Sequence, residues 1–129
     1  MKLNFAHICD YASLSENGKV NIMGIFQSFF TKSVPFTYPQ FFIVTNSTVN
    51  RSGNLKQSIR FIRDKDGQDI ISPLEFNVSA TQPSASGESK VGVLARLNNV
   101  QFDEVGSYTV QIFIEEEKVG EAKFFVEEK

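Results

Sequence analysis

The side chains with the clearest potential for chemistry are His7 and Cys9, the one histidine and the one cysteine among the 129 residues. Two positions apart on an extended strand, they would project from the same face, as a Cys–His pair or half of a metal site requires. A zinc site needs about four such ligands, and a nucleophile needs a base that a third group orients. We therefore interpret Cys9 as a small apolar residue and predict no catalytic residue, no enzyme activity and no cofactor.

A second candidate is a group of acidic side chains around Gly67 that resembles part of a calcium loop: Asp64, Asp66 and Asp69. With Gly67 at the glycine position of an EF-hand loop, Ile62 would occupy the first ligand position and no glutamate the twelfth. We interpret the segment as a hairpin turn in which Asp and Gly serve the backbone. Weak calcium binding stays open as the alternative, and no metal site is predicted.

Aromatic residues are concentrated between positions 26 and 42, which hold 7 of the chain's 16 (13 Phe and 3 Tyr). Pro35 and Pro39 interrupt this stretch, so over residues 31–40 we predict a crossover loop in place of a paired strand. Aromatic side chains that cannot all turn inward become anchors for a partner. We predict that four of them contact a partner: Phe29, Phe30, Phe36 and Tyr38. The alternative is that these four rings plug the open end of a sandwich.

The elements that must position these residues are strands. Short runs rich in Val, Ile, Phe and Thr alternate with clusters of Gly, Asn, Asp, Ser and Pro along the whole chain. This pattern predicts an all-β fold of about eight strands without substantial helix, in one domain over residues 1–129. Asn17-Gly18 predicts a tight hairpin between the first two strands, and residues 102–126 predict a second hairpin that closes the fold. Alternation places the apolar residues of its first strand on one face: Tyr108, Val110, Ile112 and Ile114.

The approach to the last hairpin carries the pattern Asp103-x-x-Gly106-x-Tyr108. It resembles the tyrosine corner of immunoglobulin-like sandwiches, in which a tyrosine near the start of a late strand hydrogen-bonds to the backbone. We therefore predict an antiparallel immunoglobulin-like β-sandwich. Val110 stands where an antibody domain carries its second cysteine, and the chain has no tryptophan, so the resemblance concerns architecture and not function.

Two further stretches, residues 7–12 (HICDYA) and 17–24 (NGKVNIMG), accompany the Gly106-x-Tyr108 hairpin. Together they resemble an uncharacterised family of short prokaryotic β-sandwich proteins. The resemblance implies a β-sandwich fold and no assigned activity.

Charge and composition limit the partners. The net charge is −2, with 13 basic and 15 acidic residues, so the chain lacks the positive field that phosphate contacts require, and we predict no nucleic-acid partner. Asn4, His7 and Asp10 interrupt any signal-peptide core, and no apolar run approaches the roughly 20 residues of a membrane span. With a single cysteine, these features predict a cytoplasmic protein without a membrane partner.

The sequence therefore predicts a non-enzymatic interaction or structural module. It would self-associate or dock a protein partner through the aromatic loop and an edge strand. The alternative is a small-ligand or carbohydrate-binding sandwich, with Tyr38 and residues 81–88 framing a pocket.

Overall fold

The structure is a computed structural model and describes residues 1–17, 19–80 and 87–129. These residues form ten β-strands and no helix, so the all-β prediction is confirmed and the expected number of strands was too low. The strands are β1 (Lys2–Leu14), β2 (Val20–Phe26), β3 (Ser28–Thr31), β4 (Phe36–Val49), β5 (Gly53–Arg63), β6 (Gln68–Asp69), β7 (Leu74–Ala80), β8 (Ser89–Phe102), β9 (Gly106–Ile114) and β10 (Glu117–Glu128).

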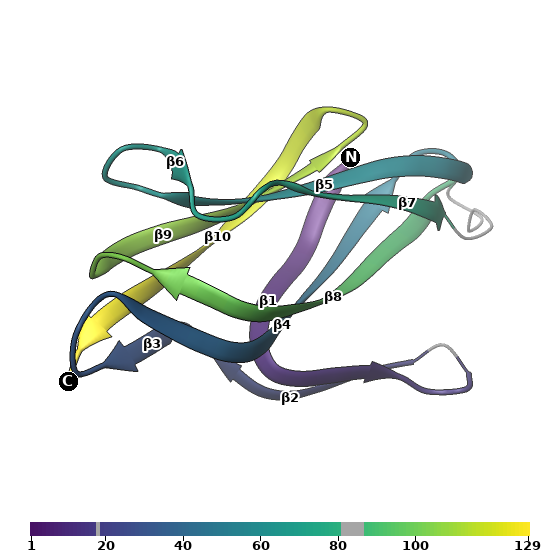
Figure 1. Ribbon diagram of the computed structural model, residues 1–129. Helices are drawn as coiled ribbons and strands as arrows, with labels where there is room; N and C mark the ends of the chain where they lie inside the picture. The colour runs from purple at the N-terminus through teal and green to yellow at the C-terminus, as the bar shows by residue number, and fades with distance from the viewer. Residues whose placement is uncertain (18, 81–86) are drawn as a thin grey trace.

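The strands are arranged in two sheets (Figure 1). One has four strands in the order β2-β1-β4-β8, and the other has six, in the order β3-β10-β9-β5-β6 with β7 also paired to β5. After β2 the chain passes into the second sheet, where β3 pairs parallel with the end of β10. The predicted purely antiparallel, eight-stranded immunoglobulin-like sandwich is therefore not confirmed, because this crossing creates a mixed sheet.

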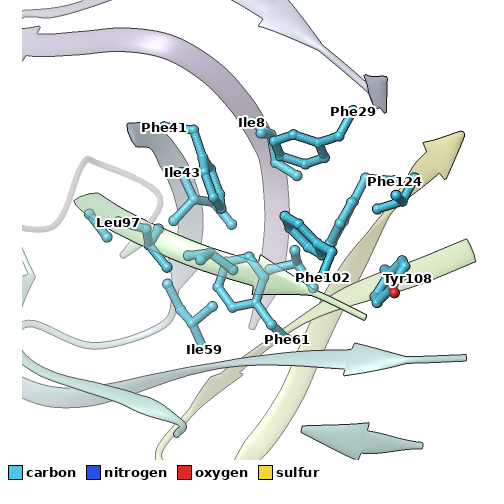
Figure 2. Close-up of a cluster of buried hydrophobic side chains, with 14 of the residues drawn as sticks. Ile8, Phe29, Phe41, Ile43, Ile59, Phe61, Leu97, Phe102, Tyr108 and Phe124 are labelled. Carbon is cyan, nitrogen blue, oxygen red and sulfur yellow. The ribbon is translucent and has the colours of Figure 1, made fainter. Parts of the chain in front are cut away.

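The main core lies between the two sheets (Figure 2). Ile8, Phe41 and Ile43 come from the four-stranded sheet. Ile59 and Phe61 come from β5 in the other sheet. Because neighbouring strand residues point to opposite faces, alternating apolar residues of β9 and β10 reach this interior: Tyr108, Val110, Ile112, Phe124 and Val126. Ile114 belongs to a second, smaller buried cluster, and Ala122 is half-buried.

The stretch around Pro39 is a strand, so the prediction of a crossover loop over residues 31–40 was wrong for its second half. Strand β4 pairs with β8 from Phe36 onward, whereas its pairing with β1 begins at Phe42, opposite Cys9. Pro39 therefore has a partner strand on one side and none on the other. A residue without a backbone N–H is tolerated at such an edge because it removes no hydrogen bond between strands.

Both predicted hairpins form. Strands β1 and β2 pair antiparallel up to Leu14 and Val20, and the backbone N–H of Ser15 donates to the carbonyl of Lys19 at 2.9 Å. Gly18 lies outside the described residues, so the conformation of the Asn17-Gly18 turn stays a prediction. In the second hairpin, Glu115 and Glu116 occupy the turn with φ of 50° and 70°, the left-handed pair that a two-residue type I′ turn requires.

Tyr108 is buried at the start of β9, and its hydroxyl donates to the backbone carbonyl of Glu104 at 2.5 Å. Two residues before it, Gly106 adopts a φ of 133°, which a residue with a side chain rarely adopts. Asp103 accepts a hydrogen bond from the amide of Gln101 at 2.7 Å. These contacts hold the turn that enters β9. The immunoglobulin-like interpretation of this corner stays a prediction.

Candidate functional site

The aromatic residues predicted to contact a partner do not form one surface. Phe29 is 1% exposed and packs against Tyr38 and Phe102, with ring centroids 4.7 and 5.0 Å away. Phe36 is half-buried and stacks on Phe102 at 5.4 Å. Phe30 alone among the four is exposed, at 57%, with the Lys129 ammonium 5.6 Å from its ring. Phe29, Phe36 and Tyr38 therefore pack within their own chain, and the predicted docking surface is reduced to Phe30.

Cys9 lies among apolar side chains, whereas His7 lines a pocket that it shares with Gln27 and Lys123. They pair with Val44 and Phe42 on β4, and the His7 ring stacks on Phe5 at 5.1 Å. Cys9 is fully buried, and this burial raises the pKa of its thiol. A buried thiol that resists ionisation is a poor nucleophile. The arrangement supports the interpretation of Cys9 as a packing residue.

The three aspartates around Gly67 are directed to three different cations. The ion pairs are Asp64–Lys123 at 3.1 Å, Asp66–Arg63 at 2.8 Å and Asp69–Arg60 at 3.1 Å. Burial raises the pKa of the Asp64 carboxyl, but hydrogen bonds from Thr109, Ser107 and Lys123 outweigh it, so the pKa is lowered overall. Within the described residues no three His, Cys, Asp or Glu side chains gather to hold a metal ion. The geometry therefore gives no support to the calcium alternative.

The predicted ligand pocket would need two segments that lie at opposite ends of the sandwich. Tyr38 pairs with Val100 near the beginning of β4, whereas Ser89, which follows the loop, pairs with Val49 at its end. Eleven residues of strand separate Tyr38 from Val49, which corresponds to roughly 36 Å. Residues 81–86 of that loop lie outside the described residues. One pocket framed by Tyr38 and the described end of the loop, Gly87 and Glu88, is excluded by this distance.

A small polar group is enclosed between the sheets. The Gln57 amide donates to the Thr45 hydroxyl at 2.9 Å. The side-chain oxygen of Gln57 and the hydroxyls of Ser47 and Ser89 are buried without a hydrogen-bond partner in the described part of the chain. This group contains no titratable side chain and does not reach the surface, so it cannot act on a substrate.

Exposed apolar side chains are instead concentrated on the β1–β2 hairpin. Of the nine large hydrophobic residues that are exposed among those described, five lie on these two strands. We call them the hairpin patch: Tyr11, Leu14, Val20, Met23 and Ile25, with exposed fractions of 50, 66, 43, 62 and 55%. Tyr11 and Met23 are cross-strand partners, as are Leu14 and Val20. The two pairs are three positions apart, so alternation along the strands places them on opposite faces of the hairpin. Exposed apolar side chains gathered on one element are typical of an interaction site.

Strand β2 is also an open edge of its sheet, since no strand lies beyond it in the described sheet order. It contains no charged residue and no proline, although these are the usual protection of an edge. The other edges differ. Strand β8 carries exposed Lys90 and Arg96, β7 carries exposed Glu75, and β3 has four residues. The uncharged run of residues 20–26 is visible in the sequence, but the sequence does not show that this strand lies at an edge.

Among the described residues no helix is long and apolar enough to cross a membrane.

One solved structure with a similar chain is described as "Pseudomonas fluorescens alkylpurine DNA glycosylase AlkC bound to DNA containing an abasic site analog". The similarity covers 94% of the present chain and 30% of that chain, with a TM-score of 0.43 and 9% sequence identity. That protein is bound to DNA, which overturns our exclusion of nucleic acid, because the exclusion depended on net charge alone. A likeness this weak carries no positive argument, so we do not propose DNA binding in its place.

Among curated proteins, none matches this sequence. Residues 4–127 match the family described as "Family of unknown function (DUF6941)". The predicted resemblance to an uncharacterised family is therefore confirmed, and nothing in these comparisons indicates a specific function. Because the match extends over nearly the whole chain, the protein belongs to the DUF6941 family of unknown function.

Proposed function

We propose that this chain is a non-enzymatic protein-interaction module that self-associates through the hairpin patch. One observation carries the proposal: five of the nine exposed large hydrophobic side chains among the described residues lie on the β1–β2 hairpin, and its strand β2 is uncharged and has no neighbour on its outer edge in the described sheet order. The function class is the one that the sequence predicts. We place the interaction surface on the β1–β2 hairpin and not on the predicted aromatic loop, because most aromatic rings of that loop pack in the core.

The energetic case depends on the side chains that a partner would cover. Full burial of a Met or Ile side chain contributes about 1.5–3 kcal/mol. Met23 and Ile25 are slightly more than half exposed, so covering each would contribute roughly 1 kcal/mol. In a symmetric dimer both copies contribute, and pairing of strand edges adds backbone hydrogen bonds. The contacts are few, so we expect reversible association.

The remaining surface supports the absence of catalysis. The carboxylates around Gly67 form ion pairs with basic side chains, and the thiol of Cys9 is buried. General acid–base or nucleophilic chemistry requires such groups to be accessible to a substrate. A single free and buried cysteine also agrees with the reducing environment of the cytoplasm, which we propose as its compartment.

The test is the mass of the protein in solution, measured by sedimentation equilibrium from micromolar to submillimolar concentration. We expect the unmodified protein to dimerise and a Met23→Lys, Ile25→Lys variant to remain monomeric. Both residues are exposed, so thermal unfolding of the variant monomer should change little. The control is Phe30→Lys, which adds one lysine, against the two of the double variant, at a similarly exposed residue of β3 and should still dimerise.

Two results would refute the proposal. The first is an unmodified protein that stays monomeric over the whole concentration range. The second is a dimer that the Phe30→Lys substitution disrupts and the β2 double substitution does not, because that pattern would return the interface to the aromatic loop.

A further inference from the structure

We infer that the two copies pair strand to strand, β2 against β2, antiparallel about a two-fold axis at Met23. The two four-stranded sheets would thereby become one continuous eight-stranded sheet. This inference depends on the proposed function and adds the geometry of the interface. Patch-to-patch packing of the same residues, without pairing of the strand edges, is the competing arrangement.

The identity of the partner follows from the absence of charge on β2. In an antiparallel pair of identical strands, residues near the two-fold axis face themselves or close neighbours. Like charges directly opposite each other are destabilising, so an edge that pairs with its own copy should be neutral. Strand β2 is neutral over its whole length, from Val20 to Phe26. Strand β8, the other edge of this sheet, carries Lys90 and Arg96 and would repel its own copy.

The register follows from the length of the neutral strand. Lys19 precedes it and the chain leaves the sheet at Gln27, so placing the axis at the central residue, Met23, uses all of β2. This register pairs Val20 with Phe26, Asn21 with Ile25, Ile22 with Gly24 and Met23 with itself. Each of the flanking pairs occurs twice.

Gly24 fits its place in this register. It bends β2 with a φ of 70°, and its missing side chain leaves room for the Asp10 carboxylate, which a Cβ would meet at 2.5 Å. In the dimer, Ile22 of the second copy lies opposite this glycine, whose side-chain position is already taken by the Asp10 carboxylate.

The same register joins the apolar faces of the two copies. Tyr11 of β1 lies beside Met23 of β2 within one chain. Pairing Met23 with Met23 of the second copy therefore produces one row across four strands, with a tyrosine at each end and two methionines between them. Tyr11 is 50% and Met23 is 62% exposed in the monomer, so this row gains burial from both sides. Because the interface is isologous, assembly closes at a dimer and does not propagate into fibres.

The test is disulfide cross-linking with single introduced cysteines. Directly opposed residues of an antiparallel pair have Cα atoms about 4.5–5.5 Å apart, within the range that a disulfide spans. Met23→Cys should therefore form a covalent dimer under mild oxidation. The native Cys9 is fully buried and stays in place, so the unmodified protein is the control without a cross-link.

The discriminating control is Asn21→Cys. It has the same exposed surroundings on β2, but its own copy would lie about four residues away along the strand, roughly 14 Å. We expect it to cross-link at least about tenfold more slowly than Met23→Cys, because its Cα separation exceeds the disulfide limit. Mixing Asn21→Cys with Ile25→Cys should restore cross-linking, since that register places the two residues opposite each other.

The outcomes separate the two proposals. Efficient cross-linking of Met23→Cys together with poor cross-linking of Asn21→Cys supports the register. If sedimentation shows a dimer but Met23→Cys does not cross-link, or Asn21→Cys cross-links as fast, the register is wrong and the interaction module stands. If the unmodified protein and Met23→Cys are both monomeric under reducing conditions, the proposed function itself is refuted.

Discussion

Replacing Tyr108 by phenylalanine tests how the entrance to the last hairpin is held. The substitution removes one oxygen from a fully buried residue and leaves the ring in place. That oxygen donates to the Glu104 carbonyl at 2.5 Å, and burial raises the pKa of the phenol, so the proton for this bond is retained at neutral pH. The ring itself stacks on Phe124 at 5.3 Å and meets Phe102 edge-on at 5.6 Å.

The two parts of this side chain should have separate and different effects. Loss of the hydroxyl removes one hydrogen bond and leaves the half-buried carbonyl of Glu104 to water, which costs about 1–1.5 kcal/mol. Tyr108→Ala also removes the ring from between Phe124 and Phe102 and should cost about 3–5 kcal/mol. For a chain of this size, the loss of the hydroxyl corresponds to a decrease of about 4–6 °C in Tm.

Urea unfolding of the three proteins, followed by circular dichroism, measures these differences. The slope of the free energy of unfolding against urea concentration should stay the same, so that only the midpoint moves. A Tyr108→Phe variant as stable as the unmodified protein would show that the hydrogen bond contributes nothing. A loss equal to that of Tyr108→Ala would show that the oxygen, and not the ring, determines the packing, and either result would refute the reasoning.

Three further predictions concern stability. Glu116→Gly should raise the free energy of unfolding by about 0.5–1 kcal/mol in urea titrations, because the residue has a φ of 70°, which is unfavourable for a side chain. Asp64→Asn should destabilise by about 1–2 kcal/mol at pH 7 through its hydrogen bond with Lys123. Because the folded-state pKa of Asp64 is lowered, the unmodified protein should lose this advantage as pH falls below about 4 through the folded-state pKa, as unfolding measured from pH 7 to 2.5 would reveal. Gly120→Ala should cost about 1–3 kcal/mol, since a Cβ would lie 2.6 Å from the Leu3 side chain, and a Leu3→Ala substitution should recover part of that loss in a double-mutant cycle.

The local features of the fold could be predicted from the sequence because they depend on neighbouring residues. The alternation of apolar residues in β9 predicted which of its side chains are buried, and Tyr108, Val110, Ile112 and Ile114 are all inaccessible. Both hairpins followed from turn residues flanked by strand-forming runs. Cys9 could be interpreted as an apolar residue from the sequence alone, because the chain has no second cysteine and only one histidine with which it could form a metal or catalytic site.

The errors arose where pairing between distant segments decides the outcome. Pro39 predicts a loop on local grounds, but β8 pairs with the residues on either side of it, Tyr38 and Gln40. Phe29 is in the core because β3 joins β10, from the other end of the chain. A local pattern cannot predict this parallel pair, which also ends the resemblance to an antiparallel immunoglobulin-like sandwich.

The sequence by itself determined the all-β class, the resemblance to an uncharacterised family and the lack of a recognisable catalytic pattern, since each of these depends on residue types and short spacings. The tertiary structure decided where an interaction surface can be. Whether an apolar strand residue is buried or exposed depends on what covers its face, and whether a strand can accept a partner depends on its place in the sheet order. Met23 and Ile25 have the same strand-forming pattern as core residues elsewhere in the chain. Their exposure arises because β2 is the last strand of its sheet.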